Sequence, residues 1–139
     1  MSTVASDTLR AERISEAELQ SAIIELAQRY GWLVHHARPA RNVRGWSTPI
    51  QGDSGFPDLV LAKNGCVLFA ELKSERGRLR PEQRAWMQVL DGEREGALLP
   101  DQRRVLRPIH DGGWVAIVVW RPSDWLSGEI ESLLTGRAS

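Results

Sequence analysis

Residues 57–73 read PDLVLAKNGCVLFAELK, two apolar runs that meet at an Asn64-Gly65 pair. Asn-Gly between two apolar runs is a strong signal of a β-hairpin, because both residues tolerate the positive φ of a tight turn. With these two residues in the turn, the strand register places Asp58 directly opposite Glu71, whereas a three-residue loop or a bulge would shift it by one. Directly opposed residues share one face of the sheet. The hairpin therefore predicts two neighbouring acidic side chains.

Lys73 is expected on the same face as Glu71, because side chains in a strand alternate with a period of two. The remaining positions of both runs are apolar, which is typical of central, buried strands. Two buried carboxylates side by side repel each other and lose hydration, so they need cations to stay ionised. Lys73 supplies one positive charge. A divalent ion with oxygen ligands, Mg²⁺ or Mn²⁺ in preference to zinc, would supply the rest. The alternative is a buried lysine–carboxylate cluster that only fixes strand register.

Two predicted helices carry polar residues that could face this hairpin. Ser15 opens a capping box, and the helix that follows has apolar residues at helical spacing until Gly31. Pro81, at a first helical position, opens a second helix. Glu16 at the start of the first helix, and Gln83 in the first turn of the second, both border the apolar faces of their helices. For each of them the alternative is an ordinary helix-end residue.

The periodicity of the whole chain predicts an α/β fold, a mixed β-sheet flanked by helices in the order αβββαβα. Strands are expected at residues 32–36, 57–62, 66–73 and 114–120, and the last helix is expected to begin at Pro122. Alternating helical and strand periods exclude an all-α or an all-β domain.

The expected domain organisation is simple. Residues 1–14 show no clear period and are expected to be a flexible or partly helical arm, and residues 15–135 a single domain. Within the domain, residues 38–55 are rich in Arg, Pro, Gly and Ser and predict a long functional loop. Residues 92–112 are charged and contain Gly and Pro, so they are expected to loop out as an insertion. A tolerated surface insertion, a DNA contact and a subunit interface are the alternatives for its role.

Composition limits the class of protein. A chain of 139 residues with 42% hydrophobic residues fits one domain with a real core. Its single cysteine, Cys66, excludes a disulfide framework and a cysteine metal site. No apolar stretch is long enough to span a bilayer, and the polar start lacks the apolar core of a signal peptide. We therefore expect a soluble, intracellular, cytoplasmic protein with no membrane partner and no organic cofactor.

Charge is spread unevenly along the chain although the formal net charge is zero. Residues 29–80 contain nine cationic and four acidic side chains, a net charge of +5. Arginines flank the predicted centre on both sides in sequence, and their planar forks suit phosphate groups. These candidate DNA contacts are Arg38, Arg41, Arg44, Arg76, Arg78 and Arg80. A solvated charged face is the alternative. His35 and His36 are adjacent on a strand and must point to opposite faces, so one is expected to be buried and the other could meet phosphate.

Five sequence blocks in this order resemble one known family. They are SEAELQ (15–20), GFPDLVLA (55–62), FAELKSERGRL (69–79), PEQRAW (81–86) and VVWRPSDW (118–125). Together they resemble the VRR-NUC family of PD-(D/E)XK nucleases, whose fold is the restriction-endonuclease-like mixed sheet. The likeness is to small stand-alone members of bacterial or phage origin that resemble Holliday-junction resolvases. It departs from the family pattern at residues 92–112, where a short turn is usual.

The resemblance implies a ligand set for Mg²⁺, with Mn²⁺ as a substitute. Asp58 and Glu71 would hold the ion, and the backbone carbonyl of Leu72 would be an additional ligand. Glu16 matches the acidic residue of the family's first helix, and would bind a second metal ion or its water.

The resemblance also implies a reaction. Lys73 would orient or help deprotonate the attacking water and stabilise charge on the phosphate, and Gln83 would support Lys73 or the phosphate. The expected activity is hydrolysis of DNA phosphodiester bonds to 5′-phosphate products by a structure-selective endonuclease, with RNA as the alternative substrate. A homodimer is expected because two strands of a junction must be cut symmetrically. The alternative function is a catalytically inactive nuclease-like module for DNA binding or protein interaction.

Overall fold

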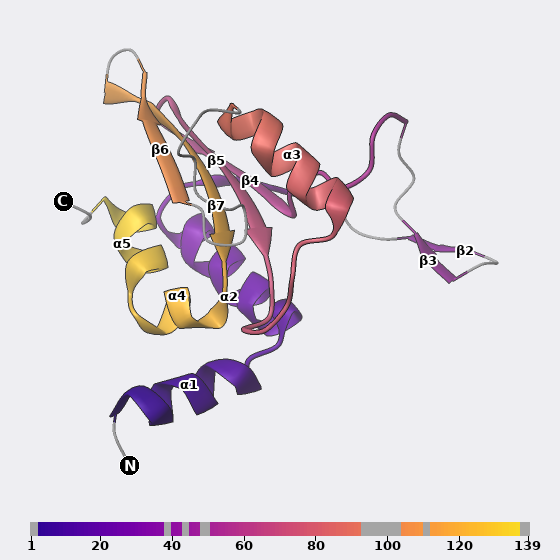
Figure 1. Cartoon of the computed structure of the whole chain (residues 1–139). Helices are drawn as coiled ribbons and strands as arrows, with labels where there is room; N and C mark the ends of the chain where they lie inside the picture. Colours follow the sequence, from indigo (N-terminus) through magenta and orange to yellow (C-terminus); the bar gives the residue numbers. More distant parts are fainter. Residues whose placement is uncertain are drawn as a thin grey trace.

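The computed structural model describes residues 3–37, 40–42, 45–47, 51–92, 104–109 and 112–136. Its centre is a five-stranded mixed sheet (Figure 1). In spatial order the strands are β1 (Leu33–His36), β4 (Leu59–Lys63), β5 (Cys66–Leu72), β7 (Trp114–Trp120) and β6 (Arg104–Pro108). Strands β5 and β7 run parallel, and the other neighbouring pairs run antiparallel. A separate two-stranded hairpin is formed by β2 (Ala40–Asn42) and β3 (Gly45–Ser47).

Helices cover both faces of the main sheet (Figure 1). They are α1 (Thr3–Arg13), α2 (Glu16–Arg29), α3 (Pro81–Asp91), α4 (Pro122–Leu126) and α5 (Glu129–Thr135). Helices α2 and α5 lie on one face and α3 on the other, while α1 packs beside α4. The predicted class, a mixed sheet with flanking helices, is confirmed. None of the helices that the structure describes is long and apolar enough to cross a membrane.

The β4–β5 hairpin has the predicted register. Lys63 pairs with Cys66, and the ladder continues without a bulge to Leu59 opposite Ala70. Asn64 and Gly65 both have positive φ, +46° and +79°, as a type I′ hairpin turn requires. The two-residue turn therefore sets which side chains of β4 and β5 face each other.

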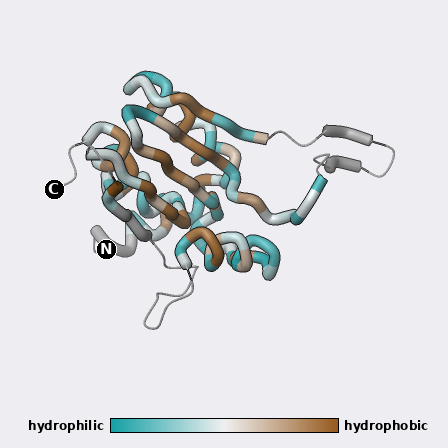
Figure 2. Tube along the Cα trace, turned by 90° about the horizontal axis from the view of Figure 1, so that it is seen from above, coloured by the Kyte–Doolittle hydropathy of each residue, from teal (hydrophilic) through white to brown (hydrophobic). Residues whose placement is uncertain are grey.

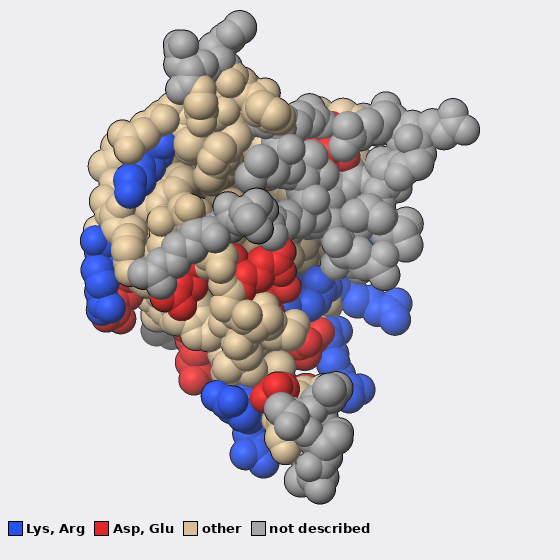
Figure 3. Space-filling view, turned by 90° about the vertical axis from the view of Figure 1, so that its left-hand side faces the viewer, with Lys and Arg blue, Asp and Glu red and all other residues tan. Residues whose placement is uncertain are grey.

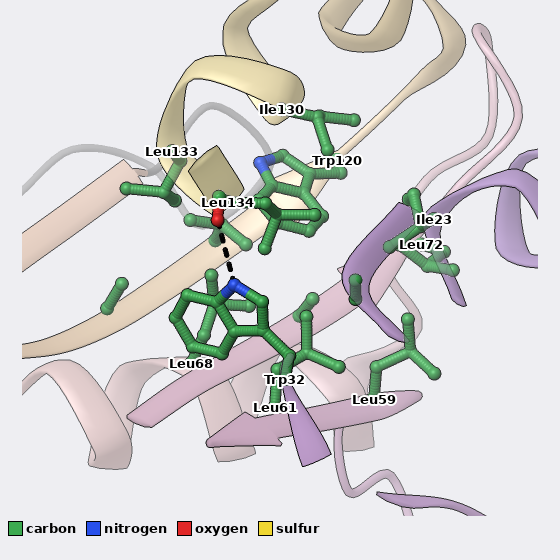
Figure 4. Close-up of a cluster of buried hydrophobic side chains, with 14 of the residues drawn as sticks. Ile23, Trp32, Leu59, Leu61, Leu68, Leu72, Trp120, Ile130, Leu133 and Leu134 are labelled. Atoms are coloured by element: carbon green, nitrogen blue, oxygen red, sulfur yellow. Dashed lines mark hydrogen bonds between the residues drawn. The ribbon is translucent and has the colours of Figure 1, made fainter. Parts of the chain in front are cut away.

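The alternation along β4 and β5 divides the core in two. On one face, apolar strand residues pack against α2 and α5, with Leu19 and Ile23 from α2 among the fully buried side chains. Trp32 closes this layer, since its indole Nε1 donates to the backbone oxygen of Leu134 at 2.8 Å (Figure 4). On the other face, Met87 of α3 packs in a smaller cluster of buried residues. Figure 2 shows the hydrophobic residues concentrated along the strands.

The N-terminal and C-terminal segments contain more helix than the predicted order includes. Residues 1–14, expected to be a flexible or partly helical arm, contain α1, which buries Ala11. The single last helix is two helices, because Gly128 adopts a φ of +84° between α4 and α5. Left-handed glycine ends one helix and re-aims the chain for the next. The division into an arm and one domain stays a prediction.

The two segments expected to be irregular contain extended structure. The expectation that residues 92–112 loop out is wrong for Arg104–Pro108, which pair as β6 with β7. An edge strand tolerates proline and charge, so its sequence carries little strand signal. The expected long loop at 38–55 contains the β2–β3 hairpin. Residues 93–103 of the insertion lie outside the described part.

Candidate active site

Asp58 and Glu71 come together at one end of the β4–β5 hairpin. Asp58 directly precedes β4, and one further step of the observed register beyond Leu59 and Ala70 places it beside Glu71. The carboxylate Oδ2 of Asp58 accepts a hydrogen bond from the backbone N–H of Leu72 at 2.8 Å. Asp58 is thereby held across the hairpin, in the arrangement that the turn predicts.

Glu71 is the most constrained charged residue of the site. Its side chain is 1% exposed, and neither carboxylate oxygen has a hydrogen-bond partner among the residues that the structure describes. The ammonium Nζ of Lys73 lies 3.8 Å from its Oε1. Burial, followed by the negative charge of Asp58, raises the pKa of Glu71 to about 9, although Lys73 opposes the rise. Such a carboxylate is stable in ionised form only if a further cation approaches it.

The donor atoms at this position fit a hard divalent cation. Asp58 and Glu71 offer carboxylate oxygens, the ligand type that Mg²⁺ and Mn²⁺ prefer, and both oxygens of Glu71 are buried and unpartnered within the described part of the chain. No group of three His, Cys, Asp or Glu side chains converges as a metal site among the described residues. Backbone oxygens or water would therefore have to complete the coordination. The predicted carbonyl ligand, Leu72, is adjacent in sequence to Glu71.

A pocket of about 640 Å³ opens over Asp58, and the elements around it supply eight polar side chains. They are Glu16, Gln20, His36, Asp53, Ser54, Asp58, Arg80 and Gln83. Three of the five predicted catalytic residues therefore line one cavity. Glu71 and Lys73 do not line it; they are buried and adjoin it through Asp58, with which Glu71 interacts.

Glu16 begins α2 at the pocket. Partial burial of its carboxyl raises its pKa, the charge of Lys73 lowers it and the charge of Asp58 raises it. These interactions place Glu16 in the electrostatic field of the site. It does not join Asp58 and Glu71 in a three-acid cluster of described residues. A role through water or a second ion fits this position better than direct binding of the same ion.

Gln83 has a structural role in addition to its place in the pocket. It is buried, and its Oε1 accepts a hydrogen bond from the backbone N–H of Arg80 at 2.9 Å. This contact satisfies a backbone donor just before α3, as the N3 residue of a capping box does. Gln83 is therefore a helix-capping residue, as the alternative for it had it, and it also lines the pocket.

The segment before Asp58 is packed tightly on α3, which sequence reasoning missed. Gly55 has a φ of +96°, and a β-carbon there would lie 2.5 Å from the backbone oxygen of Glu82. Trp86 donates its indole N–H to the backbone oxygen of Ser54 at 3.0 Å. The ring of Phe56 meets that of Trp86 edge-on, with centroids 5.0 Å apart. The only local signal was the glycine before Phe56.

Sequence reasoning missed Gln20 as a site residue, and it gave His36 only as one of two histidines of which one could meet phosphate. His36 ends β1, and its ring Nδ1 lies 3.2 Å from the backbone oxygen of Asp58. Its Nε2 lies 2.9 Å from the side-chain nitrogen of Gln20 in α2. The expectation that one histidine of the pair is buried is wrong: His36 is half-buried and His35 is exposed. An edge strand leaves both sides of β1 partly open to solvent.

The predicted DNA-contact arginines are placed unequally. Arg38 and Arg44 lie outside the described residues, and the structure describes only the backbone of Arg41, in β2. Arg76 is bound to Glu12 of α1 with an Nη2–Oε1 distance of 2.6 Å, Arg80 lies 3.1 Å from Glu82, and Arg78 is exposed.

The family comparison agrees with this geometry. The model of the VRR-NUC domain matches residues 14–119, which include Glu16, Asp58, Glu71, Lys73 and Gln83. No curated protein matches the chain. The matched region covers most of the chain, from the start of α2 to the end of β7. The chain therefore belongs to the VRR-NUC family, a nuclease domain of the PD-(D/E)XK type.

Proposed function

We propose that this chain is a Mg²⁺-dependent endonuclease that hydrolyses DNA phosphodiester bonds at junctions, flaps or single-stranded regions. The observation that carries the proposal is Glu71, which is buried beside Asp58 and forms an ion pair with Lys73, while neither of its carboxylate oxygens has a hydrogen-bond partner among the described residues. A protein that used this cluster only to fix strand register would be expected to pair those oxygens. A cation site explains why they are left open.

Each residue of the site has a separate role in the proposed hydrolysis. Asp58 and Glu71 hold the cation, with the Leu72 carbonyl as a further ligand. When bound, Mg²⁺ supplies positive charge that stabilises the phosphate in the transition state. Lys73 stabilises charge on the phosphate as an ammonium, and it orients or, in its neutral form, helps deprotonate the attacking water. Gln83 borders the same pocket and supports the phosphate or Lys73. The product carries a 5′-phosphate.

The pocket also suggests how nucleic acid reaches the site. Arg80 lines it together with Asp58, and Arg78 is exposed two residues earlier. Both follow β5 closely in sequence, so they extend positive charge from Lys73 towards solvent. Glu16 contributes through a second ion or its water. A homodimer would let two such sites cut both strands of a junction, and sedimentation or light scattering of the purified chain tests that state.

The direct test replaces Asp58 with a residue of the same shape. Asp58→Asn keeps an oxygen that can accept from the Leu72 N–H, so the hairpin is expected to fold. Cleavage of labelled junctions, flaps, single strands and duplexes with Mg²⁺ or Mn²⁺ is expected to fall at least about 100-fold, because even outer partners of metal ligands are worth about 10- to 100-fold. Unchanged cleavage would refute the assignment.

A matched control separates a lost ligand from a changed pocket. Asp53 lines the same pocket but is not part of the proposed metal site, and it is exposed. Asp53→Asn removes the same charge and is expected to cleave nearly as well as the wild-type chain. A wild-type chain inactive on every substrate with both metals would instead favour the inactive DNA-binding or interaction module.

A further inference from the structure

The ring of His36 bridges α2 and the backbone of Asp58. Its Nδ1 lies 3.2 Å from the Asp58 carbonyl oxygen, and its Nε2 lies 2.9 Å from the side-chain nitrogen of Gln20. A carbonyl oxygen only accepts hydrogen bonds, so Nδ1 carries the hydrogen. In the neutral ring Nε2 is then an acceptor, and the Gln20 amide donates to it. One tautomer satisfies both contacts.

The Asp58 carbonyl lies where the β1–β4 backbone ladder has ended, so a side chain has to supply its hydrogen-bond donor. Strands β1 and β4 pair through His36 opposite Leu59, and the backbone ladder ends at that pair. Asp58 lies one residue before β4, so its carbonyl is beyond the last backbone pair of the sheet. The imidazole supplies a donor where the ladder has ended. Together with the Leu72 N–H on the carboxylate, it holds Asp58 at two points.

We propose that His36 is a positioning residue for Asp58, and that Gln20 fixes the orientation of the His36 ring. The bridge holds the Asp58 backbone so that the carboxylate keeps its place beside Glu71. Residues that orient a metal ligand in this way commonly change metal affinity or activity by about 10- to 100-fold when removed. The inference rests on the proposed function for the identity of the cation, but the bridge itself is independent of cleavage.

The chain contains a matched control for this proposal. His35 is the neighbouring residue on the same strand, is exposed, and does not line the pocket. Its replacement removes an imidazole from β1 without touching Asp58. His36→Ala and His35→Ala therefore report on the bridge and on the strand separately.

Conservative substitutions at His36 distinguish positioning from simple packing. In His36→Asn the side-chain amide nitrogen takes roughly the place of Nδ1, so it can still donate to the Asp58 carbonyl. In His36→Gln the amide nitrogen lies near the place of Nε2, where it cannot. A packing role would favour the larger glutamine, whereas a positioning role favours asparagine.

The experiment measures Mn²⁺ binding to the metal-free chain by electron paramagnetic resonance, together with single-turnover cleavage. His36→Ala and His36→Gln are expected to bind Mn²⁺ about 10- to 100-fold more weakly, and His36→Asn to recover most of the loss. His35→Ala is expected to match the wild-type chain. Equal Mn²⁺ affinity in His36→Ala and wild type would overturn the proposal, as would recovery by glutamine but not by asparagine.

A spectroscopic measurement keeps the proposal testable if His36→Ala fails to fold. The ¹⁵N chemical shifts of the wild-type ring are expected to show a protonated Nδ1 and an unprotonated Nε2. The opposite tautomer would overturn the bridge. A chain that binds Mn²⁺ with this tautomer but cleaves no nucleic acid refutes the proposed function alone, whereas cleavage with unchanged His36→Ala affinity refutes only the positioning role.

Discussion

At the scale of single residues, the site concentrates unfavourable electrostatics in Glu71. This side chain is 1% exposed, and the charged groups acting on it are two carboxyls, of Asp58 and Glu16, and one ammonium, of Lys73. A single positive charge at 3.8 Å does not offset both burial and these carboxyls, since the pKa of Glu71 remains raised. The metal-free protein therefore holds a proton that a bound cation would have to displace.

This proton predicts how stability depends on pH. The pKa of Glu71 is about 9 in the folded chain against its usual 4.5, so the folded state binds more protons than the unfolded state between these values. The contribution of protonated Glu71 to the stability of the metal-free protein is full below about pH 4.5 and is lost as the pH rises towards 9. Each unit of the shift is worth about 1.4 kcal/mol. Thermal unfolding with chelator from pH 5 to pH 9 measures the effect.

Glu71→Gln is the control for this pH dependence. It cannot ionise, so its unfolding temperature is expected to fall less steeply over the same pH range and to exceed that of the wild type near pH 9. Identical slopes in the two proteins would mean that Glu71 does not carry the shift.

Lys73 is expected to act in catalysis without binding the cation. Lys73→Met removes a positive charge beside Glu71, so Mn²⁺ affinity is expected to stay level or rise. Single-turnover cleavage at saturating Mg²⁺ is expected to fall about 10²- to 10⁴-fold, the range of a lost proton-transfer group. Calorimetry measures the Mn²⁺ affinity, and cleavage assays measure the single-turnover rate. Lys63→Met, at the turn end of the same hairpin, is the control, and weaker Mn²⁺ binding in Lys73→Met would contradict the assigned role.

At the scale of elements, helix α3 organises the approach to Asp58. Gln83 caps its start, and Trp86 one turn later binds the backbone of Ser54. Gly55 lies against the helix backbone at Glu82, directly before Gln83. The loop before β4 therefore has little freedom to shift along α3, and the position of Asp58 depends on the contact of this loop with the helix.

Two glycines of this loop make the close approach testable. Gly55→Ala and Gly52→Ala both place a side chain at positive φ, +96° and +111°, which costs about 1–3 kcal/mol in each. Only at Gly55 does the new β-carbon meet backbone, 2.5 Å away, because nothing lies within 4 Å at Gly52. Chemical denaturation is expected to show an additional loss of about 1–3 kcal/mol for Gly55→Ala, with reduced Mn²⁺ affinity. Equal losses would show that the loop can move away from α3.

At the scale of the whole molecule, one described face carries basic and acidic side chains next to one another. The face to the left of Figure 1 shows basic and acidic side chains close to one another over its described part (Figure 3). This agrees with a formal net charge of zero. Helix α1 contributes to the mixing, because its Glu12 binds Arg76. Nucleic acid would therefore be attracted by local arginines and not by an overall positive field.

The salt dependence of nucleic-acid binding distinguishes arginines that contact phosphate from arginines that are paired within the protein. With Asp58→Asn as the uncleaving background, Arg78→Ala is expected to reduce the slope of log K against log salt concentration by about 0.9, one duplex phosphate contact. Arg76→Ala is expected to change the slope less, because Glu12 already neutralises that guanidinium. Fluorescence anisotropy at several salt concentrations measures both. A larger effect for Arg76 would mean that it leaves Glu12 to bind phosphate.

The sequence by itself determined the hairpin and the neighbours it brings together. Asn64 and Gly65 set the turn, and strand alternation then places Asp58, Glu71 and Lys73 in one register. These relations follow from residues close together in the chain, where φ preferences and the period of two leave few alternatives. The class of fold was predictable for the same reason, since long periodic segments specify their own type.

Tertiary structure alone decided what surrounds the acidic pair. The contact of His36 with Asp58 and Gln20, the packing of Gly55 on α3 and the pairing of Arg76 with Glu12 join segments far apart in sequence. No local period encodes such contacts, because they arise when separate elements pack on one core and exclude water between them. Within the described part of the chain, the lack of hydrogen bonds to the Glu71 oxygens has the same origin: burial on the sheet removes solvent from a carboxylate that the sequence had only placed beside Asp58.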